Sequence, residues 1–329
     1  MKKKTNKGLI VFIIILLLIA LGVALAISDN QREKNKDYSN NGNPNGSSLH
    51  YANEAKKIMR NKKDYIAAVY IEGIIEEKNN TYNQKWLLSV IDNLKYDDNN
   101  VAIALYINTP GGGVYEADEV YLSLLDYKSA GKKIYVYMGP IAASGGYYIS
   151  CAANKIYANR NTLTGSIGVI SSQVYDLTEL LETLGIESTT IYSGDNKNMG
   201  NINEPFTEEQ QEIMQAICDE CYEQFLGIVV ESRKLSYEEG RKLADGRIYT
   251  AKQALSKGLI DNISNWNEMI ENLSVATTGD YYCNVKTYKY EKKPTFMESL
   301  LETMGMNIKN TAAYKVNQAA MPMYIYSAR

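Results

Sequence analysis

The sequence is poor in histidine and cysteine, and both shortages exclude kinds of active site. One histidine occurs among 329 residues. It is His50, which lies in a polar stretch ahead of the folded region. A Ser-His-Asp or Cys-His arrangement inside a folded domain is therefore excluded. The four cysteines are too few for a disulfide framework in a chain of this length.

Two of the cysteines, Cys218 and Cys221, have the CxxC spacing of some metal and redox sites. They lie inside a helical apolar pattern that includes Met214, Phe225 and Val229. A zinc ion would need two more ligands, and the chain has one histidine to offer. We interpret both cysteines as core residues and expect no metal and no cofactor.

Basic charge is also scarce once the first seven residues are set aside. Those residues hold Lys2, Lys3, Lys4 and Lys7 and no acidic residue. The whole chain has 35 basic and 38 acidic residues, so without those four lysines its formal charge is −7. Such a chain offers no basic surface, and nucleic acid is not expected as a partner.

An uncharged apolar run, residues 8–28, follows these lysines and is long enough to cross a bilayer. Lysines before the run and none directly after it predict a cytoplasmic N-terminus, with everything downstream outside the cytoplasm. We interpret residues 1–28 as a retained, single-pass transmembrane anchor in the cell membrane. The alternative is a cleaved signal peptide, because Ala24-Leu25-Ala26 resembles a processing site.

Beyond this anchor the chain divides into three parts. Residues 29–63, rich in Asn, Lys, Ser and Gly, are typical of a polar tether. Residues 64–275 are expected to form one α/β domain, and residues 276–329 a C-terminal extension and tail. Apolar runs predict strands at 65–71, 101–107 and 134–138, with helices at 86–94, 115–125 and 144–152. Regular alternation of strand and helix predicts a parallel sheet with flanking helices.

Further along, two helix starts have the spacing of capping boxes. Thr207 is followed three residues later by Gln210, and Ser236 by Glu239. The first is expected to open a long helix that reaches about Val230.

A serine stands among small residues where the strand at 134–138 gives way to a helix. The stretch is Met138-Gly-Pro-Ile-Ala-Ala-Ser-Gly-Gly-Tyr-Tyr148. A serine at such a turn is either a helix cap or a nucleophile whose oxyanion faces the free N–H groups of the helix. Without a histidine in the domain, the base for Ser144 would be a lysine or a carboxylate, and serine enzymes of this kind use lysine.

A glycine-rich loop follows the buried strand at 101–107. It reads Asn108-Thr-Pro-Gly-Gly-Gly113 and falls at the carboxyl end of the strand, where α/β folds gather their ligands. Consecutive glycines let backbone N–H groups approach a substrate closely. The loop lacks the spacing of a nucleotide-binding motif, so an ordinary tight turn or a substrate-binding loop of an enzyme is the better interpretation.

Five motifs together carry a family resemblance that spans about residues 65–261. They are Asn108-Thr-Pro-Gly-Gly-Gly113, Ala142-Ala-Ser-Gly-Gly-Tyr-Tyr148, Leu163-Thr-Gly-Ser-Ile-Gly-Val169, Ser193-Gly-Asp-Asn-Lys197, and Asp245-Gly-Arg-Ile-Tyr-Thr250 with Gly258-Leu-Ile-Asp261. In order and spacing they resemble the signal peptide peptidase A family. That resemblance implies a core like those of the Clp protease and crotonase superfamily. It also implies a membrane-anchored serine endopeptidase that works outside the cytoplasm as a homo-oligomeric ring.

The resemblance also assigns roles to individual residues. It implies Ser144 as nucleophile, Lys197 as general base and Ser166 as the residue that orients the lysine amine. Backbone N–H groups of Gly112 and Gly145 would form the oxyanion hole, although three successive glycines leave the register of the first donor open. In the short family form a neighbouring subunit can contribute the lysine, and we expect the same here.

Alternatives of other classes remain open at this point. A catalytically silent membrane-anchored scaffold of the same fold is one, since fold does not fix function. A crotonase-like acyl-CoA enzyme is less favoured, because a location outside the cytoplasm removes its substrate. For an active peptidase, the expected substrates are remnant signal peptides or other apolar peptides.

The last nine residues, 321–329, form an apolar, β-rich tail. Two interpretations of the tail compete. It is either a terminal strand packed on its own domain, or a strand added to the edge of the substrate groove, where it competes with substrate.

Overall fold

Residues 63–292 and the short segment 323–325 are described by the structure, a computed structural model. All of them belong to one unit, Ala55–Arg329. The expected anchor at 1–28 and all but the last residue of the expected tether lie outside the described residues. Within the described part of the chain, no helix is long and apolar enough to span a membrane.

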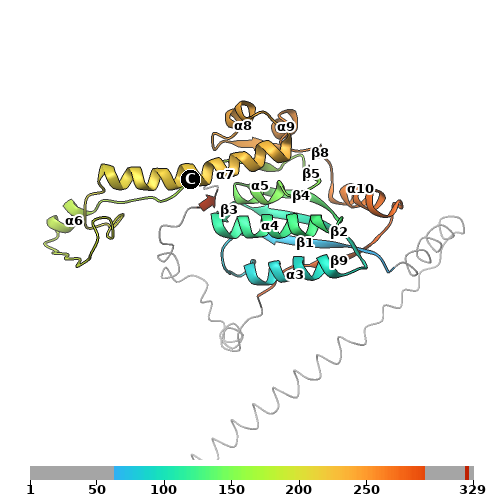
Figure 1. The fold of residues 1–329 in the computed structure, drawn as a ribbon, viewed down its shortest axis with the longest axis horizontal. Helices are drawn as coiled ribbons and strands as arrows, with labels where there is room; N and C mark the ends of the chain where they lie inside the picture. The colour runs from blue at the N-terminus through green and yellow to red at the C-terminus, as the bar shows by residue number, and fades with distance from the viewer. Residues whose placement is uncertain (1–62, 293–322, 326–329) are drawn as a thin grey trace, which may run out of the picture. The chain divides into compact units, whose positions relative to one another are not determined.

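Eight strands form one twisted sheet at the centre of the domain (Figure 1). They are β1 (Tyr65–Glu72), β2 (Asn100–Thr109), β4 (Lys133–Ala143), β5 (Lys155–Ala158), β6 (Leu163–Gly165), β7 (Ile248–Thr250), β8 (Asn262–Ile263) and β9 (Asn284–Tyr288). The main path runs β7-β6-β4-β2-β1-β9, and β5 pairs with both β4 and β8. The three strands expected from sequence are β1, β2 and β4, side by side at its centre.

The expected parallel pairing is confirmed for six pairs of strands in this sheet, but β7 runs antiparallel to β6. β7 begins at Ile248, opposite Gly165 at the carboxyl end of β6. Although α6, α7 and α8 lie between the two strands, the chain re-enters the sheet at the carboxyl end of β6, so β7 runs in the opposite direction. The sheet is mixed.

β4 is longer than the expected strand because it continues through Gly139 and Pro140. Its first half pairs with β5 up to Met138, and its second half pairs with β6 from Ile141. Pro140 is exposed and falls between these two ladders, where the absence of its N–H costs no hydrogen bond. The register against β2 shifts at the same place. This irregularity lets one strand serve two partners and end at Ala143, directly before Ser144.

Helices cover both faces of the sheet. The described helices are α3 (Gln84–Tyr96), α4 (Val114–Ser129), α5 (Gly145–Ser150), α6 (Thr178–Thr183), α7 (Glu208–Arg233), α8 (Tyr237–Leu243), α9 (Ala251–Ser256) and α10 (Trp266–Thr278), of which α6 lies away from the sheet. Apolar side chains of α3, α4, α5 and the end of α7 join one buried cluster with alternate residues of β1, such as Val69. Ile66, on the other face of β1, packs with Met269 and Leu273 of α10. Burying both faces explains the continuous apolar runs of the central strands.

Several local predictions are confirmed, and one segment joins the sheet from beyond the expected domain. Both expected capping boxes, at Thr207 and Ser236, are formed with their side-chain and backbone hydrogen bonds. Lys234 ends α7 in the left-handed conformation, close to the expected end. β9 falls in the expected extension at 276–329, yet it pairs in parallel with β1.

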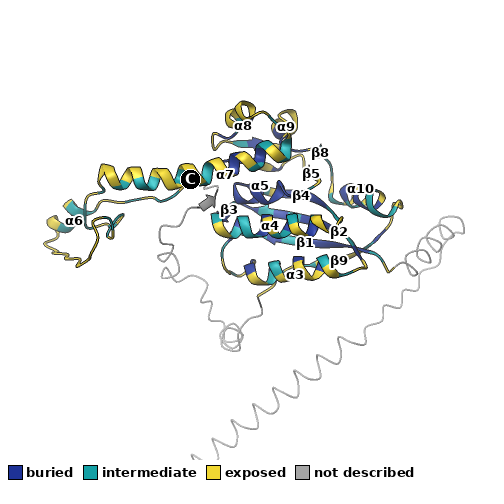
Figure 2. Cartoon of the chain, in the orientation of Figure 1, coloured by how far each residue is buried: buried dark blue, intermediate teal, exposed yellow. Residues whose placement is uncertain are grey.

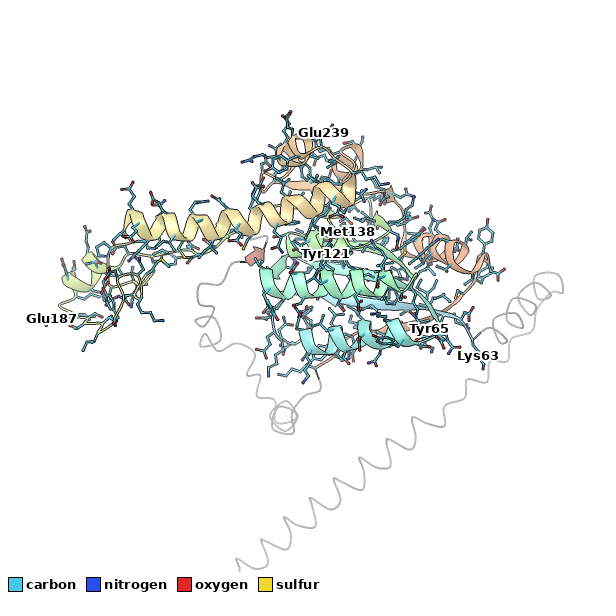
Figure 3. All side chains as sticks on the ribbon, viewed as in Figure 1. Lys63, Tyr65, Tyr121, Met138, Glu187 and Glu239 are labelled. Carbon is cyan, nitrogen blue, oxygen red and sulfur yellow. The ribbon has the colours of Figure 1, made fainter. Side chains whose placement is uncertain are left out.

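One long segment, residues 168–224, contains no buried residue and is called the arm here (Figure 2). It comprises α6, its flanking loops and the first two thirds of α7. Glu187, in the arm, lies far from Tyr121 and Met138 in the body of the domain (Figure 3). The interpretation of Cys218 and Cys221 as core residues is wrong, because both are only partly buried on this part of α7.

A short strand from the C-terminal tail pairs with the glycine loop. The loop forms β3 (Gly111–Gly113), and β10 (Met323–Ile325) lies antiparallel to it, with Tyr324 opposite Gly112. The tail is thus added as a strand to an edge of its own domain, as both interpretations of its sequence require. Residues 326–329 lie outside the described part.

Candidate active site

Ser144 stands at a strained turn between β4 and α5. Its backbone angles are φ 55° and ψ −117°, in a region that residues with a side chain rarely occupy. Such strain costs about 1–3 kcal/mol and persists only where the surroundings impose it. Here the Ser144 N–H donates to Gly165 O at 2.8 Å, and the Ser144 carbonyl accepts from the Tyr148 N–H at 2.9 Å.

The side chain of Ser144 is buried but has no hydrogen-bond partner among the described residues. The residue is 1% exposed, and its Oγ contacts no donor or acceptor. It caps no N–H of α5 either, which removes the interpretation as a helix cap. A buried hydroxyl left unpaired costs free energy, so a partner from outside the described chain is the expected remedy.

Ser166 lies beside Ser144 because β6 pairs with the end of β4. Ala143 is opposite Gly165, and Ser166 follows directly. Ser166 also has a positive φ, 50°, and its N–H donates to Arg247 O at 2.8 Å. Thr164 Oγ1 fixes the same strand end by donating to Ala142 O at 2.6 Å. The Thr-Gly-Ser motif therefore builds the wall next to the nucleophile.

The glycine strand β3 is held against Ile75 from one side. Gly113 N–H donates to Ile75 O, Ile75 N–H donates to Gly111 O, and Gly111 N–H donates to the Thr109 hydroxyl. A Cβ on Gly112 would fall on the Ile75 carbonyl, so only glycine fits there. Because successive N–H groups of a strand point to opposite edges, the Gly112 N–H lies on the edge away from Ile75. That is the edge along which β10 pairs.

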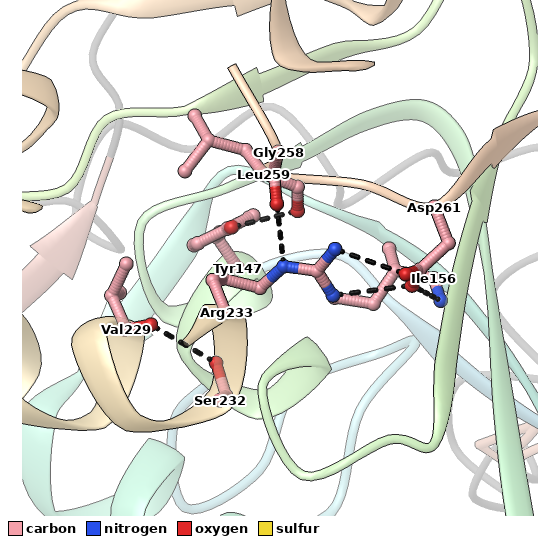
Figure 4. A network of polar contacts seen from close by, with 8 residues as sticks. All are labelled: Tyr147, Ile156, Val229, Ser232, Arg233, Gly258, Leu259 and Asp261. Atoms are coloured by element: carbon pink, nitrogen blue, oxygen red, sulfur yellow. Dashed lines mark hydrogen bonds and ion pairs between the residues drawn. The ribbon is translucent and has the colours of Figure 1, made fainter. Parts of the chain in front are cut away.

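The helix that follows Ser144 is held by hydrogen bonds to residues 258–261, called the α5 support here (Figure 4). Tyr147 donates its hydroxyl proton to Leu259 O at 2.7 Å. Arg233 Nε donates to Gly258 O, and its two terminal nitrogens reach both oxygens of Asp261 at 3.1 Å. Asp261 also accepts a hydrogen bond from the Ile156 N–H at 2.7 Å, which connects the α5 support to β5.

Burial affects the pKa values of the ionisable side chains in and beside the α5 support. It raises the pKa of Tyr147 well above its usual value, so the phenol stays a proton donor. Burial alone would lower the pKa of Arg233, but the hydrogen bonds and charge of Asp261 outweigh it and the pKa is raised. Cys151, at the end of α5, has a pKa raised to about 11, chiefly by burial, and is therefore a neutral thiol.

Lys197 lies on the arm and is exposed. Its backbone N–H donates to Gly194 O, which folds the Ser-Gly-Asp-Asn-Lys motif into a turn. No hydrogen bond joins its side chain to Ser144 within the described chain. The structure thus places Ser144, Gly145, Ser166 and Gly112 on adjoining elements around the sheet, whereas Lys197 lies on the arm.

Some residues that shape the site carried no sequence signal. Ile75 and Arg233 act through contacts between distant segments, which spacing along the chain does not reveal. Asp261 and Tyr148 stood within the quoted motifs but had no assigned role. Across residues 63–292, no group of three or more His, Cys, Asp or Glu side chains stands close enough to hold a metal ion.

A strained, buried serine between a parallel strand and a short helix is the arrangement of a serine hydrolase. The sequence model of peptidase family S49 matches residues 126–278, which include Ser144, Ser166 and Lys197. A putative protease of Synechocystis sp. is 33% identical over 252 residues, which cover 73% of this chain and 88% of that protein. The chain belongs to peptidase family S49.

Other relatives agree with this assignment. A putative signal peptide peptidase SppA of Enterococcus faecium is 34% identical over 220 residues, 65% of this chain and 63% of that protein. Protease 4 of Salmonella typhi is 27% identical over 288 residues, 86% of this chain and 46% of that protein. The match thus spans less than two thirds of either relative. Among solved structures, a ClpP1 mutant of Listeria monocytogenes is 18% identical with a TM-score of 0.43, covering 66% of this chain and 99% of that one.

Proposed function

We propose that this chain is a membrane-anchored serine endopeptidase in which Ser144 is the nucleophile and Lys197 the general base. One observation carries the proposal: the Ser144 hydroxyl is buried at a strained turn and has no partner among the described residues. An enzyme that keeps a hydroxyl in this condition gains a nucleophile that a neutral amine can deprotonate. In the reaction, Oγ attacks a peptide carbonyl while Lys197 takes its proton, the C–N bond breaks, and the leaving amine receives that proton. Water then hydrolyses the acyl-enzyme ester, releasing the new carboxylate and restoring the Ser144 hydroxyl.

Two backbone N–H groups are suited to stabilise the oxyanion. The Gly112 N–H lies on the edge of β3 that faces away from Ile75 and that β10 occupies, since its neighbours Gly111 and Gly113 direct theirs to Thr109 and Ile75. The Gly145 N–H belongs to the first turn of α5 and has no acceptor within the helix. These observations support Gly112 as the donor among the three glycines. Removing one such donor typically lowers kcat by about 10²–10³.

The base is proposed to come from a neighbouring subunit. The arm carries large apolar side chains that are half exposed or more, including Ile170, Leu184 and Ile191, the last at 95%. A segment of this length without one buried residue gains its apolar burial from another surface. A second copy of the chain supplies that surface in a homo-oligomeric ring and places Lys197 beside the Ser144 of its neighbour. Ser166, next to Ser144, then accepts a hydrogen bond from the amine and orients it.

The proposed substrates are remnant signal peptides or other apolar peptides in extended form. β3 offers an edge that accepts an antiparallel strand, since β10 occupies it in this way. The relative from Enterococcus faecium is named a putative signal peptide peptidase, which supports the substrate class. The proposed place of the catalytic domain is outside the cytoplasm, with residues 1–28 as anchor. Digestion of the domain by protease added to intact spheroplasts tests that location.

Labelling with a fluorophosphonate tests the nucleophile. The full-length protein is expected to gain one label per chain, on Ser144, and to lose hydrolysis of a fluorogenic peptide in parallel. Ser144→Ala is expected to abolish both. The matched control is Ser150→Ala, which also removes a buried hydroxyl from α5, one that donates to Gly146 O.

The silent-scaffold alternative gives a different result in the same experiment. A scaffold would remain unlabelled in the wild type at any concentration of phosphonate. Peptide hydrolysis that survives Ser144→Ala would equally remove Ser144 from the mechanism.

A further inference from the structure

One buried side chain, Tyr148, joins three parts of the proposed site. Its hydroxyl donates to Asp118 Oδ1 at 2.6 Å and accepts from Gln224 Nε2 at 2.6 Å. Its backbone N–H donates to the Ser144 carbonyl at 2.9 Å. Tyr148 itself has no exposed surface.

Each of these partners belongs to a different part of the site. Asp118 lies in the second turn of α4, which begins directly after the glycine strand β3. Gln224 lies in α7 where the arm ends, since Phe225 is the first buried residue after it. Ser144 is the proposed nucleophile. The Tyr148 hydroxyl therefore connects α4, which follows the proposed oxyanion strand, to the segment that bears Lys197, and the Tyr148 backbone joins both to the nucleophile.

The direction of the phenol is closely fixed. The ring packs against Phe225, with centroids 5.0 Å apart, and edge-on against Tyr121 at 5.4 Å. The hydroxyl has one proton, which goes to the Asp118 carboxylate, and it accepts the Gln224 amide. A hydrogen bond to a carboxylate is shorter and stronger than one between neutral groups. Movement of α4 or of the arm would break a hydrogen bond of a group that water does not reach.

We propose that the Tyr148 hydroxyl is a positioning group for peptide hydrolysis. It sets the spacing between β3, Ser144 and the base of the arm, so that the oxyanion donor faces the nucleophile and the arm directs its lysine toward the neighbouring subunit. It touches no substrate and transfers no proton in the reaction. The inference rests on the proposed function and goes beyond it, because it assigns the alignment of three elements to one hydroxyl.

The test compares Tyr148→Phe with the control Tyr121→Phe in the full-length protein. Both variants keep their rings and the packing of α4 on α5, but only the first loses the joining hydroxyl. Tyr148→Phe is expected to lower kcat and the rate of Ser144 phosphonylation about tenfold, with KM within about twofold, because misplacement by a fraction of an ångström slows catalysis. Tyr121→Phe is expected to leave all three near the wild-type values.

Gln224→Ala is the second variant, and it removes the link from the accessible side of α7. It is expected to lower kcat in the same direction while the oligomer and the melting temperature stay unchanged. The double variant Tyr148→Phe with Gln224→Ala should lose no more than Tyr148→Phe alone, since the amide acts through the hydroxyl.

Two results would overturn the inference. One is a Tyr148→Phe protein whose kcat and labelling rate equal those of Tyr121→Phe. The other is full activity of Gln224→Ala, which decides the matter even where Tyr148→Phe fails to fold. Ser144→Ala, assayed alongside, separates this failure from failure of the proposed function: if it is inactive while Tyr148→Phe is normal, only the positioning role is lost.

Discussion

Two serines in this protein adopt backbone conformations that glycine would adopt more easily. Ser144 and Ser166 have φ of 55° and 50°, although each has a glycine beside it. At both positions a hydroxyl is retained at a cost in backbone strain. Chemistry that needs the two hydroxyls accounts for this choice better than folding does.

Ser166→Gly separates strain from chemistry. Glycine accepts the positive φ, so the variant is expected to be as stable as the wild type or more stable. It lacks the hydroxyl that would orient the lysine amine, so peptide hydrolysis should fall by about 10–100-fold. Thermal unfolding and initial rates on one preparation measure both effects. Unchanged activity with raised stability would mean that Ser166 has no part in the reaction.

Lys197→Arg tests whether the base must lose a proton. Guanidinium keeps its positive charge at any working pH, so the arginine variant is expected to be as inactive as Lys197→Ala. General-base catalysis contributes about 10²–10⁴ in rate, which sets the size of the loss. A control at Lys234, which ends α7 in the left-handed conformation, should tolerate Lys234→Arg. Appreciable hydrolysis by Lys197→Arg would remove the lysine from the mechanism.

At the scale of single elements, apolar runs predicted the central strands and helices but not the edges. β1, β2 and α7 were foreseen because they are long and strongly patterned, and Ser144 because its motif is dense in small residues. β5 to β9 have two to five residues each, too few for a pattern to emerge. The predicted strand at 134–138 ended before Pro140, whereas β4 continues to Ala143. The proline is tolerated because β4 changes its neighbour there from β5 to β6, and sequence alone does not reveal strand pairing. Lys197 lies on the arm, and its proposed partner, the Ser144 of a neighbouring subunit, cannot be predicted from the order of residues along one chain.

The C-terminal strand β10 lies on the edge of β3 that a substrate strand would use. Truncation after Ala320 is therefore expected to raise kcat/KM for a short peptide, on the order of tenfold, since a tethered competitor acts at millimolar effective concentration. Replacing residues 321–329 with a glycine-serine segment of equal length is the control that keeps chain length. Loss of the oligomer in either protein would instead assign the tail to the stability of the domain.

For the whole molecule, the exposed arm and the unpartnered serine make assembly the central question. Mixed oligomers of Ser144→Ala and Lys197→Ala chains are expected to regain part of the wild-type activity, because some interfaces then pair an intact serine with an intact lysine. The recovery is measured after subunit exchange, verified by native mass spectrometry. Verified mixed oligomers with no activity would place both residues in the same chain's site.

The many buried tyrosines predict how stability depends on pH. Burial is the largest cause of the raised pKa of Tyr65, Tyr82, Tyr127 and Tyr147. A raised folded-state pKa means that the stability is fully present below the unfolded value of about 10 and is lost as pH rises beyond it. The urea concentration at the midpoint of unfolding should therefore be lower at pH 11 than at pH 8. Tyr127→Phe, which removes one such group, should show a smaller difference, and an equal one would contradict the assignment.

The Ser144 hydroxyl, which has no hydrogen-bond partner among the described residues, has a consequence for a newly made chain. A peptidase whose nucleophile and general base lie in the same chain is active as soon as it folds. It could then cleave other unfolded proteins during their export. Within the described residues of one chain, no hydrogen bond joins the Ser144 hydroxyl to Lys197, which lies exposed on the arm. Under the proposed mechanism a single subunit is inactive, and peptidase activity appears only at concentrations at which subunits assemble. Dilution would then serve as a safeguard that needs no propeptide and no inhibitor.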